Sequence, residues 1–245
     1  MPKPTFLNLP DEKRSRIIEL ALDEFSTHPY RQASLSRIVT RAGIAKGSMY
    51  QYFTNKLDLY QWLVTEELER RRDAWLQDHA TPSTEEDGRS GLFATLERMV
   101  MTRVGFMLAH PRLARLAASA MEPTADEELR DLHGALRREH VDELVTRIRE
   151  AQVAGEIRAN AEARSLAHFL DALIVRGTTN ALLDRLGLEA HELDPARCEQ
   201  ADWRVLVDDA LELIRGGLQV VVSGPRATGP GNDPEARTMS AAHVN

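Results

Sequence analysis

The sequence predicts an all-α fold, with a small unit of three helices at the N-terminus and a larger helical region after it. Apolar residues recur every three or four positions through most of the chain, as on one face of a helix. No stretch has the strict alternation of a half-buried strand, and there is no internal repeat. Residues that stop helices separate the periodic segments; they include Pro29, Gly43, Pro111 and Gly155.

The first helix is expected to begin at Pro10, because proline and the acids after it suit the first helical turn. It should end just before Pro29, which disfavours a helical residue in front of it. Its inner stripe is Ile17, Ala21 and Phe25. Residues 1–9 in front of this helix are expected to form a loose arm.

Two short helices joined by a tight turn are predicted between residues 34 and 53. Ser34 is a good N-cap for the first, and Gly43 suits its end because glycine adopts a positive φ. The second runs from Lys46 to Phe53, with Met49 and Phe53 on its inner face. Its other residues are Lys46, Gly47, Ser48, Tyr50, Gln51 and Tyr52. This mixture of cation, hydroxyls and amide suits phosphates and base edges in a DNA major groove.

The larger region contains the remaining helices. The pattern predicts them at residues 56–78, 91–110, 112–121, 125–154, 162–186 and 202–222. Polar stretches at 80–90 and 187–200 read as connections, and residues 223–245, rich in Gly, Pro, Ser and Ala, as a disordered tail. We therefore expect a first domain at 1–55, a second at 56–222 and the tail at 223–245.

Composition and charge are compatible with a DNA partner. The net charge is −7, but residues 1–60 carry +3 and the remainder −10, an asymmetry typical of a basic nucleic-acid face on an acidic body. No apolar run approaches the ~20 residues that span a bilayer, and no signal peptide is evident. The single Cys198 excludes an internal disulfide. We expect a cytoplasmic protein without a membrane partner.

The first 60 residues resemble the DNA-binding half of the TetR family of transcriptional regulators. The matching stretches are IIELALDEFSTHPY, SLSRIVTRAGIAKGSMYQYF and NKLDLY. The resemblance is loose beyond them. Ala45 is a departure, because the family usually has Ser or Thr there as N-cap; the missing cap is expected to cost ~1 kcal/mol of local helix stability.

The resemblance implies an all-α homodimer with two helix–turn–helix heads and a ligand pocket in each larger half. It also assigns Tyr52 and Lys56 to positions that contact phosphate, and Gly47, Ser48 and Gln51 to positions that approach base edges. Further DNA contacts are expected from Ser34, Ser36, Arg37, Thr40, Lys46 and Tyr50. The expected function is a ligand-responsive repressor on a palindromic, double-stranded operator, released by a small-molecule inducer of unknown identity.

Arg103 lies on the apolar stripe of the 91–110 helix, where an unpaired charge is costly. Two interpretations stay open: an internal salt bridge or snorkelling side chain, or an anchor for an acidic ligand such as a carboxylate. The second predicts a mostly apolar pocket with a few polar groups. Its residues would be Met99, Arg103, Phe106, Met107, Met121, His140, Leu144, Phe169 and Arg176.

Assembly is predicted through the last two long helices. One short recognition helix reads few bases, so two copies on a palindrome are needed for specificity. Both helices carry apolar stripes, and Gly177, Gly216 and Gly217 allow close approach. A four-helix interface, two helices from each subunit, is the expected solution; the alternative is packing inside a monomer.

No catalytic or metal site is predicted, and no cofactor. His133 and His140 share a helix face but lie two turns apart, too far for one metal ion. Cys198 has no histidine close in sequence. The alternative function is an all-α enzyme or scaffold whose first three helices only resemble a DNA-binding unit.

Overall fold

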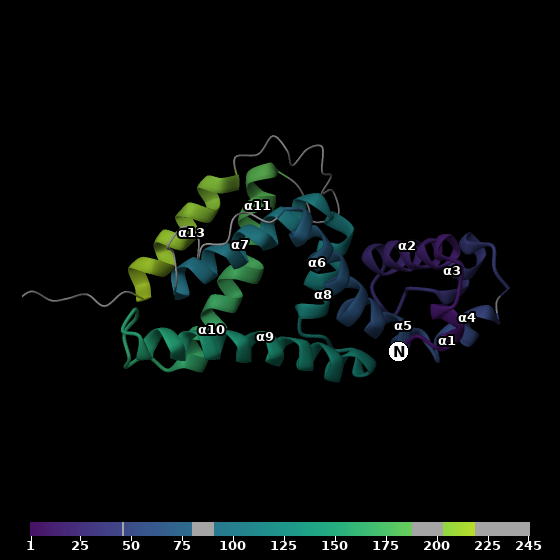
Figure 1. Ribbon diagram of the computed structural model, residues 1–245, viewed down its shortest axis with the longest axis horizontal. Helices are drawn as coiled ribbons and strands as arrows, with labels where there is room; N and C mark the ends of the chain where they lie inside the picture. Colours follow the sequence, from purple (N-terminus) through teal and green to yellow (C-terminus); the bar gives the residue numbers. More distant parts are fainter. Residues whose placement is uncertain (46, 80–90, 188–202, 219–245) are drawn as a thin grey trace, which may run out of the picture.

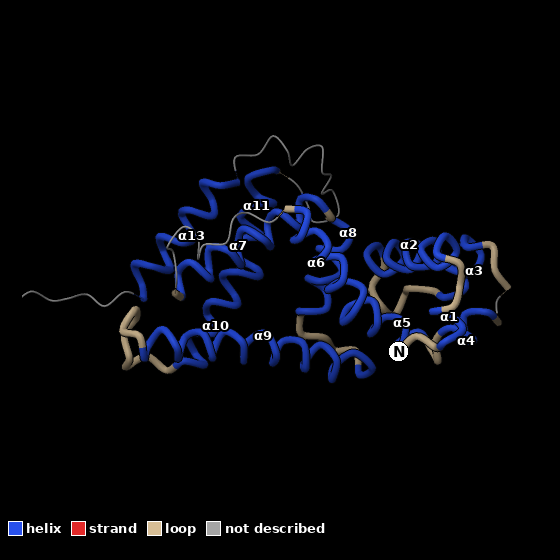
Figure 2. The backbone as a smooth tube through the Cα atoms, in the orientation of Figure 1, coloured by secondary structure: helices blue, strands red, loops and turns tan. Residues whose placement is uncertain are grey.

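The computed structural model describes residues 1–45, 47–79, 91–187 and 203–218. Within these ranges every regular element is a helix (Figure 2), so the predicted all-α fold class is confirmed. None of these helices has the length and apolar character that crossing a membrane requires. The predicted connection at 80–90, most of that at 187–200, and the tail at 223–245 lie outside the described residues.

The N-terminal helices gather at one end of the molecule (Figure 1). They are α1 (Pro4–Leu7), α2 (Asp11–Thr27), α3 (Leu35–Ala42) and α4 (Ser48–Tyr52). α2 begins directly after Pro10 and gives way to extended backbone at His28, as the sequence predicts. Its buried side chains include Ile17, Ala21 and Phe25, the predicted inner stripe.

The expectation of a loose arm at residues 1–9 is wrong. α1 is ordered because Phe6 has no exposed surface and its ring packs against three aromatic neighbours. The ring centroids of Tyr52, Phe53 and Trp62 lie 5.7, 4.9 and 5.5 Å from that of Phe6. Burying one aromatic side chain is enough to fix a short segment that has little helical propensity of its own.

A continuous helical rod leads from the N-terminal end into the rest of the molecule (Figure 1). It consists of α5 (Lys56–Trp62), the π-helical turn η1 (Leu63–Glu67) and α6 (Leu68–Asp78), which confirms the predicted helix at 56–78. Gly105 lets α6 approach the next helix closely, since a Cβ there would lie 2.8 Å from the Trp75 ring. α6 and α7 are therefore in close contact at Trp75 and Gly105.

The second half is built from long helices at steep angles to one another (Figure 1). They are α7 (Leu92–Ala109), α8 (Pro111–Met121), α9 (Glu127–Val153), α10 (Ala163–Asp171), the π-helical turn η2 (Ala172–Gly177), α11 (Thr178–Leu186) and α13 (Trp203–Leu218). α10, η2 and α11 are continuous. All the predicted helices are present, with ends within a few residues of the expected ones where these are described.

The buried side chains form two clusters. The first joins α1–α5 and η1 to α8 and to the start of α9, through residues such as Leu116 and Leu129. The second fills the space among α7, α9, α10, η2, α11 and α13. Because the first cluster includes side chains of α8 and α9, the N-terminal helices are packed into the rest of the molecule.

The continuous helix α10–η2–α11 exposes a residue that was expected in the interior. Phe169 is 70% exposed, although it was expected to line an internal pocket, and Leu173 and Ala181 of the same continuous helix are also exposed. The buried face of this helix carries Ala163, Ala167, Leu170, Ile174 and Leu182. Small alanines let α10 pack closely on α9, so the inner face holds less bulk than the outer one.

Candidate nucleic-acid interface

The turn between α3 and α4 has the geometry of a helix–turn–helix. The Ser34 hydroxyl caps α3 by accepting from the Arg37 N–H at 3.4 Å. Gly43 ends α3 with φ of 68°, in the left-handed region that favours glycine. The Ile44 N–H then donates to the Val39 carbonyl at 3.2 Å, which closes the turn. The predicted cap and stop are both confirmed.

α4 turns one face to the core and the other outward. Met49 and Phe53 are buried, which fixes Gly47, Tyr50 and Gln51 on the exposed side. Ser48 is half-buried, and Lys46 lies outside the described residues. α4 begins at Ser48, two residues later than predicted, and its N-cap is Gly47 and not Ala45, so its first turn has no side-chain cap.

Two of the residues expected at phosphates, Tyr52 and Lys56, make contacts within the N-terminal helices. Tyr52 is 6% exposed, with its ring against Phe6. The Lys56 Nζ donates to the carbonyls of Tyr30 at 2.8 Å and Ala33 at 3.4 Å, and lies 4.2 Å from the centre of the Tyr30 ring. These contacts stabilise the N-terminal helices, and a phosphate contact by either residue stays a prediction.

The outer face of α3 offers hydroxyls. Ser36 and Thr40 are exposed, and the Thr40 hydroxyl donates to the Ser36 carbonyl at 2.9 Å. Arg37 is partly exposed, but its guanidinium is occupied. It donates from Nε to Glu24 at 2.9 Å and from Nη2 to the Gln32 carbonyl at 2.7 Å. Arg37 therefore supports the turn before α3, in addition to the DNA contact predicted for it.

Glu24 is a buried acid that sequence reasoning missed. It is 2% exposed, and it accepts from the Ser34 N–H at 2.7 Å and from Arg37. Burial alone would raise the pKa of Glu24, but the hydrogen bonds from Arg37 and Ser34 outweigh it and lower that pKa below 4.5. Its position beside Phe25 on the inner side of α2 was the available signal.

Ion pairs connect the N-terminal helices to the second half. Arg71 of α6 reaches Glu19 of α2 at 2.5 Å and the buried Glu67 at 2.7 Å. Arg112 of α8 lies 3.4 Å from the same Glu19 and 3.7 Å from Asp23. This network joins α2 to the helical rod and to α8.

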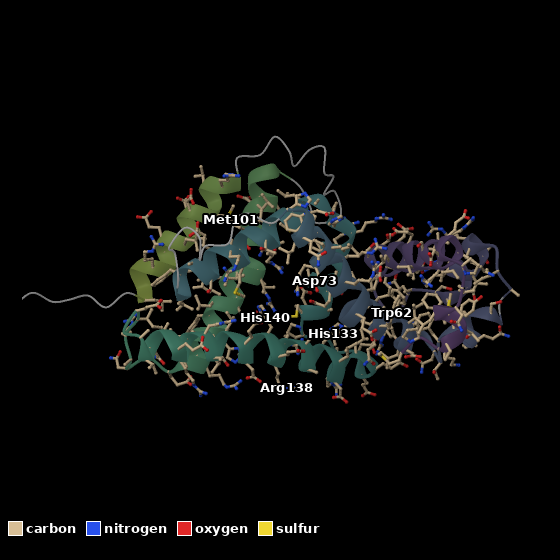
Figure 3. All side chains as sticks on the ribbon, in the orientation of Figure 1. Trp62, Asp73, Met101, His133, Arg138 and His140 are labelled. Carbon is tan, nitrogen blue, oxygen red and sulfur yellow. The ribbon has the colours of Figure 1, made fainter. Side chains whose placement is uncertain are left out.

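The predicted ligand residues are only partly brought together. Arg103 Nη2 donates to the Val175 carbonyl at 2.9 Å, and burial lowers the Arg103 pKa despite the charge of Asp171. His140 Nε2 lies 3.2 Å from Asp171 Oδ1. Within the described part of the chain, three buried atoms here make no hydrogen bond: His140 Nε2, Asp171 Oδ1 and Arg103 Nε. The side chain of His140 points from α9 toward the helices of the second half, whereas Arg138 points away (Figure 3).

The other predicted ligand residues divide into three groups. Met107 and Leu144 are buried in the second cluster, and Met99 packs against it. Phe106 belongs to the first cluster, where its ring lies 5.9 Å from that of Trp75. Three residues point elsewhere or lie at the margin: Phe169 and Arg176 are exposed, and Met121 is half-buried. The expected interior placement of Phe169 is therefore wrong, and a ligand contact by Arg176 stays a prediction. No group of three possible metal ligands occurs among the described residues.

Comparisons with known proteins place the N-terminal region among bacterial regulators. A family model described as bacterial regulatory proteins, tetR family, matches residues 17–62. The transcriptional activator FasR of Mycolicibacterium smegmatis is 38% identical over 50 residues, 20% of this chain and 23% of FasR. The regulator SrpR of Pseudomonas putida is 37% identical over 51 residues, 21% of this chain and 24% of SrpR. The chain thus spans about a quarter of these relatives, which are named as regulators and not as enzymes.

Solved structures extend the likeness over most of the chain. A TetR family transcriptional regulator from Chloroflexus aurantiacus J-10-FL has 29% sequence identity and a TM-score of 0.70, covering 90% of this chain and 99% of that one. FadR from Bacillus subtilis, in complex with stearoyl-CoA, has 20% identity and a TM-score of 0.61, covering 83% and 98%. The second likeness shows the fold alone.

Proposed function

The chain belongs to the TetR family of bacterial regulatory proteins, and we propose that it is a transcriptional regulator that binds double-stranded DNA through α3 and α4. The observation that carries the proposal is the two-sided α4. Met49 and Phe53 anchor one side in the core, and this leaves Tyr50 and Gln51 exposed on the other. A short helix presented in this way can enter a major groove.

The proposed contacts follow from exposure. Gly47, Ser48 and Gln51 approach base edges, and the amide of Gln51 is suited to an adenine. Ser34, Ser36, Thr40 and Tyr50 are proposed to contact phosphates, with Arg37 at the margin. Lys46, which precedes α4 in the sequence, is proposed as a further phosphate contact. All lysines of the chain lie in the first 56 residues: Lys3, Lys13, Lys46 and Lys56. Their positive charge favours this end of the chain for binding the DNA phosphates.

A homodimer on a palindromic operator is the proposed assembly. Exposed apolar side chains occur on the two helical segments where the interface is predicted. They are Phe169 and Leu173 on the continuous α10 and η2, and Val205 and Leu213 on α13. Ile214, by contrast, is buried in the second cluster and stabilises the subunit itself. Leu213 and Phe169 are therefore better interface residues than Ile214.

A small acidic or polar molecule is the proposed inducer. Arg103, His140 and Asp171 support this. The buried atoms Arg103 Nε, His140 Nε2 and Asp171 Oδ1 make no hydrogen bond among the described residues, although the last two lie 3.2 Å apart, and a ligand can supply the hydrogen bonds. Met107 and Leu144 supply apolar surface nearby. Ligand binding would shift α7 and the α5–η1–α6 rod, and the Arg71–Glu19 and Arg112–Glu19 pairs would pass the shift to α2. The regulator would act as a repressor if the shifted form binds DNA more weakly.

The proposal is tested by selecting duplexes from a random-sequence library with the full-length chain. Enrichment of an inverted repeat is the expected outcome. Gln51→Ala should then change the preference at one base position in each half-site, at a cost of about 1–3 kcal/mol. Gln61→Ala, an exposed position on α5, is the matched control and should leave the preference unchanged.

Failure to enrich any sequence would contradict the proposal. It would favour the alternative in which the three N-terminal helices only resemble a DNA-binding unit. If a duplex is selected, metabolites are added to its complex with the protein. They include acyl-coenzyme A thioesters, because FadR from Bacillus subtilis was crystallised with stearoyl-CoA. A compound that releases the duplex identifies the inducer class.

A further inference from the structure

α4 is too short to hold itself together. It has five residues, and the only bond of this helix to its own C-terminal cap is that of the Phe53 N–H to the Met49 carbonyl, at 2.8 Å. The last carbonyls of any helix lack partners within the helix. Here these are the carbonyls of Tyr50, Gln51 and Tyr52, the residues directly beside the proposed DNA-binding face.

The N-terminal segment supplies a partner to each of these three carbonyls. The Lys3 ammonium donates to the Tyr50 carbonyl at 2.8 Å, and the Lys3 backbone N–H donates to the Tyr52 carbonyl at 2.8 Å. The Thr5 hydroxyl donates to the Gln51 carbonyl between them. A cation at this end of a helix also complements the helix dipole. Figure 1 shows α1 lying beside α4.

The same segment is fixed from behind. Phe6 is buried against Tyr52, Phe53 and Trp62. Arg14 of α2 donates to the Leu7 carbonyl at 2.7 Å, which ties the end of α1 to α2. Residues 3–6 are thus a built connection between the core and the C-terminal end of α4.

We propose that residues 3–6, which we call the N-terminal clip, position α4 for DNA recognition. The clip completes the hydrogen bonding of the recognition helix from outside the helix–turn–helix itself. Without it, α4 is ordered in a smaller fraction of molecules, and the apparent affinity for DNA falls by that fraction. The inference rests on the proposed function for its DNA readout, but the ordering of α4 can be measured without DNA.

A competing explanation is that Lys3 simply contacts a phosphate. The two explanations differ in salt dependence. Loss of one phosphate contact lowers the slope of log affinity against log salt by about 0.9, whereas loss of positioning lowers affinity without changing the slope. Thr5 carries no charge, so its substitution isolates the positioning effect.

The first experiment measures amide exchange of the Phe53 N–H by NMR in the full-length chain. Thr5→Val removes the hydroxyl at nearly constant shape and should accelerate this exchange by about fivefold, the effect of one hydrogen bond. Thr5→Ser retains the donor and should exchange like the native chain. Thr146→Val is the matched control, since that hydroxyl donates to the Asp142 carbonyl at 3.0 Å on α9.

The second experiment measures binding to the duplex selected by the native chain, over a range of salt concentrations. Thr5→Val should bind more weakly by up to about fivefold, the limit for an α4 that is mostly unordered without the bond. Lys3→Met/Thr5→Val should bind more weakly than Thr5→Val, and both should keep the native salt slope. Thr5→Ser and Thr146→Val should bind normally.

The inference is overturned if Thr5→Val leaves both Phe53 exchange and DNA affinity unchanged. It is also overturned if Lys3→Met lowers the salt slope by about 0.9 while Phe53 exchange stays native, because Lys3 is then a phosphate contact. If the native chain selects no duplex, the proposed function fails, and the exchange rates alone decide whether the clip orders α4.

Discussion

Glu24 and Arg37 show how one ion pair supports the turn before α3. The carboxylate is buried and holds both the Ser34 N–H and the Arg37 guanidinium. Removing the partner of a buried charge leaves that charge uncompensated, which costs several kcal/mol in a closed site. Arg37 is 46% exposed, so water reduces the cost here.

We expect Arg37→Ala to lower the free energy of unfolding by about 2 kcal/mol. Arg147→Ala, which removes an exposed pair with Glu150 at 3.6 Å on α9, should cost less than about 0.5 kcal/mol. Urea denaturation at neutral pH measures both. Equal effects of the two substitutions would show that the Glu24 pair does not support the turn.

The same pair predicts a dependence on pH. The pKa of Glu24 is lowered in the folded chain, so its contribution is fully present above 4.5 and is lost as the pH falls through the folded value. Arg37→Ala should therefore differ least from the native chain in strong acid.

Two nitrogen atoms of Arg103 correspond to two different roles, one structural and one in ligand binding. Its bond to the Val175 carbonyl is structural, whereas its unpaired Nε is available to a ligand. We expect Arg103→Met to bind the selected duplex normally and to need at least tenfold more inducer for release, because a charge-assisted hydrogen bond is lost. Arg147→Met is the control. An unchanged inducer response would assign Arg103 to the structural role.

At the scale of elements, α10 and α13 carry the proposed dimer interface. Leu213 is 72% exposed. A single exposed apolar side chain is uninformative, but Phe169 is 70% exposed, and Leu173 and Val205 are exposed at 39% and 41%. Phe169→Glu and Leu213→Glu should each yield monomers without loss of helix content. Both should bind the selected duplex at least tenfold more weakly, since one head reads few bases.

Sedimentation velocity at micromolar concentration measures the oligomeric state of the native chain and of both variants. Val153→Glu is the control, because Val153 is exposed at the end of α9, outside the proposed interface. A native chain that sediments as a monomer would exclude the homodimer.

The helix ends were predictable because they depend on single residues. Pro29 and Pro111 cannot continue a helix, and Gly43 and Gly155 adopt φ of 68° and 74°. The inner face of α10 and η2 was not predictable in this way. The large apolar residues Phe169 and Leu173 lie outside, and small alanines lie inside. Periodicity alone does not tell an interface between subunits from a core.

The site was predictable to a similar extent. The core positions Met49 and Phe53 fix which side of α4 is exposed, and both follow from spacing. The roles of Lys3, Thr5 and Glu24 depend on bonds to distant backbone groups, up to 47 residues away for Lys3 and Tyr50. No local pattern encodes such partners.

At the scale of the whole molecule, α9 is attached directly to the DNA-binding end. Tyr30 donates to Glu128 at 2.8 Å, and Arg31 donates to Asp126 at 2.8 Å. Deeper inside, Tyr60 Oη lies 3.1 Å from His133 Nε2. His133 and Trp62 both lie toward the junction of the two halves (Figure 3). These contacts hold the two halves in one arrangement.

His133 makes this junction sensitive to acid. Its Nδ1 lies 3.2 Å from the Glu122 carbonyl, which can only accept, so Nδ1 carries the proton and Nε2 accepts from Tyr60. Burial lowers the His133 pKa below 6.5; the Glu122 carbonyl and Asp126 oppose this, and Arg137 adds to it. The junction is therefore at full strength above pH 6.5 and weakens as the pH falls through the folded value.

We expect the thermal midpoint of the native chain to fall more than that of His133→Gln between pH 7.5 and about 5.5. Glutamine keeps a donor and an acceptor but does not titrate in this range. Each kcal/mol lost corresponds to about 2–4 °C for a chain of this size. His110 also has a pKa lowered by burial, so His110→Gln is measured beside it. If His133→Gln and the native chain lost stability in parallel while His110→Gln did not, the acid sensitivity would belong to His110 and not to the α9 junction.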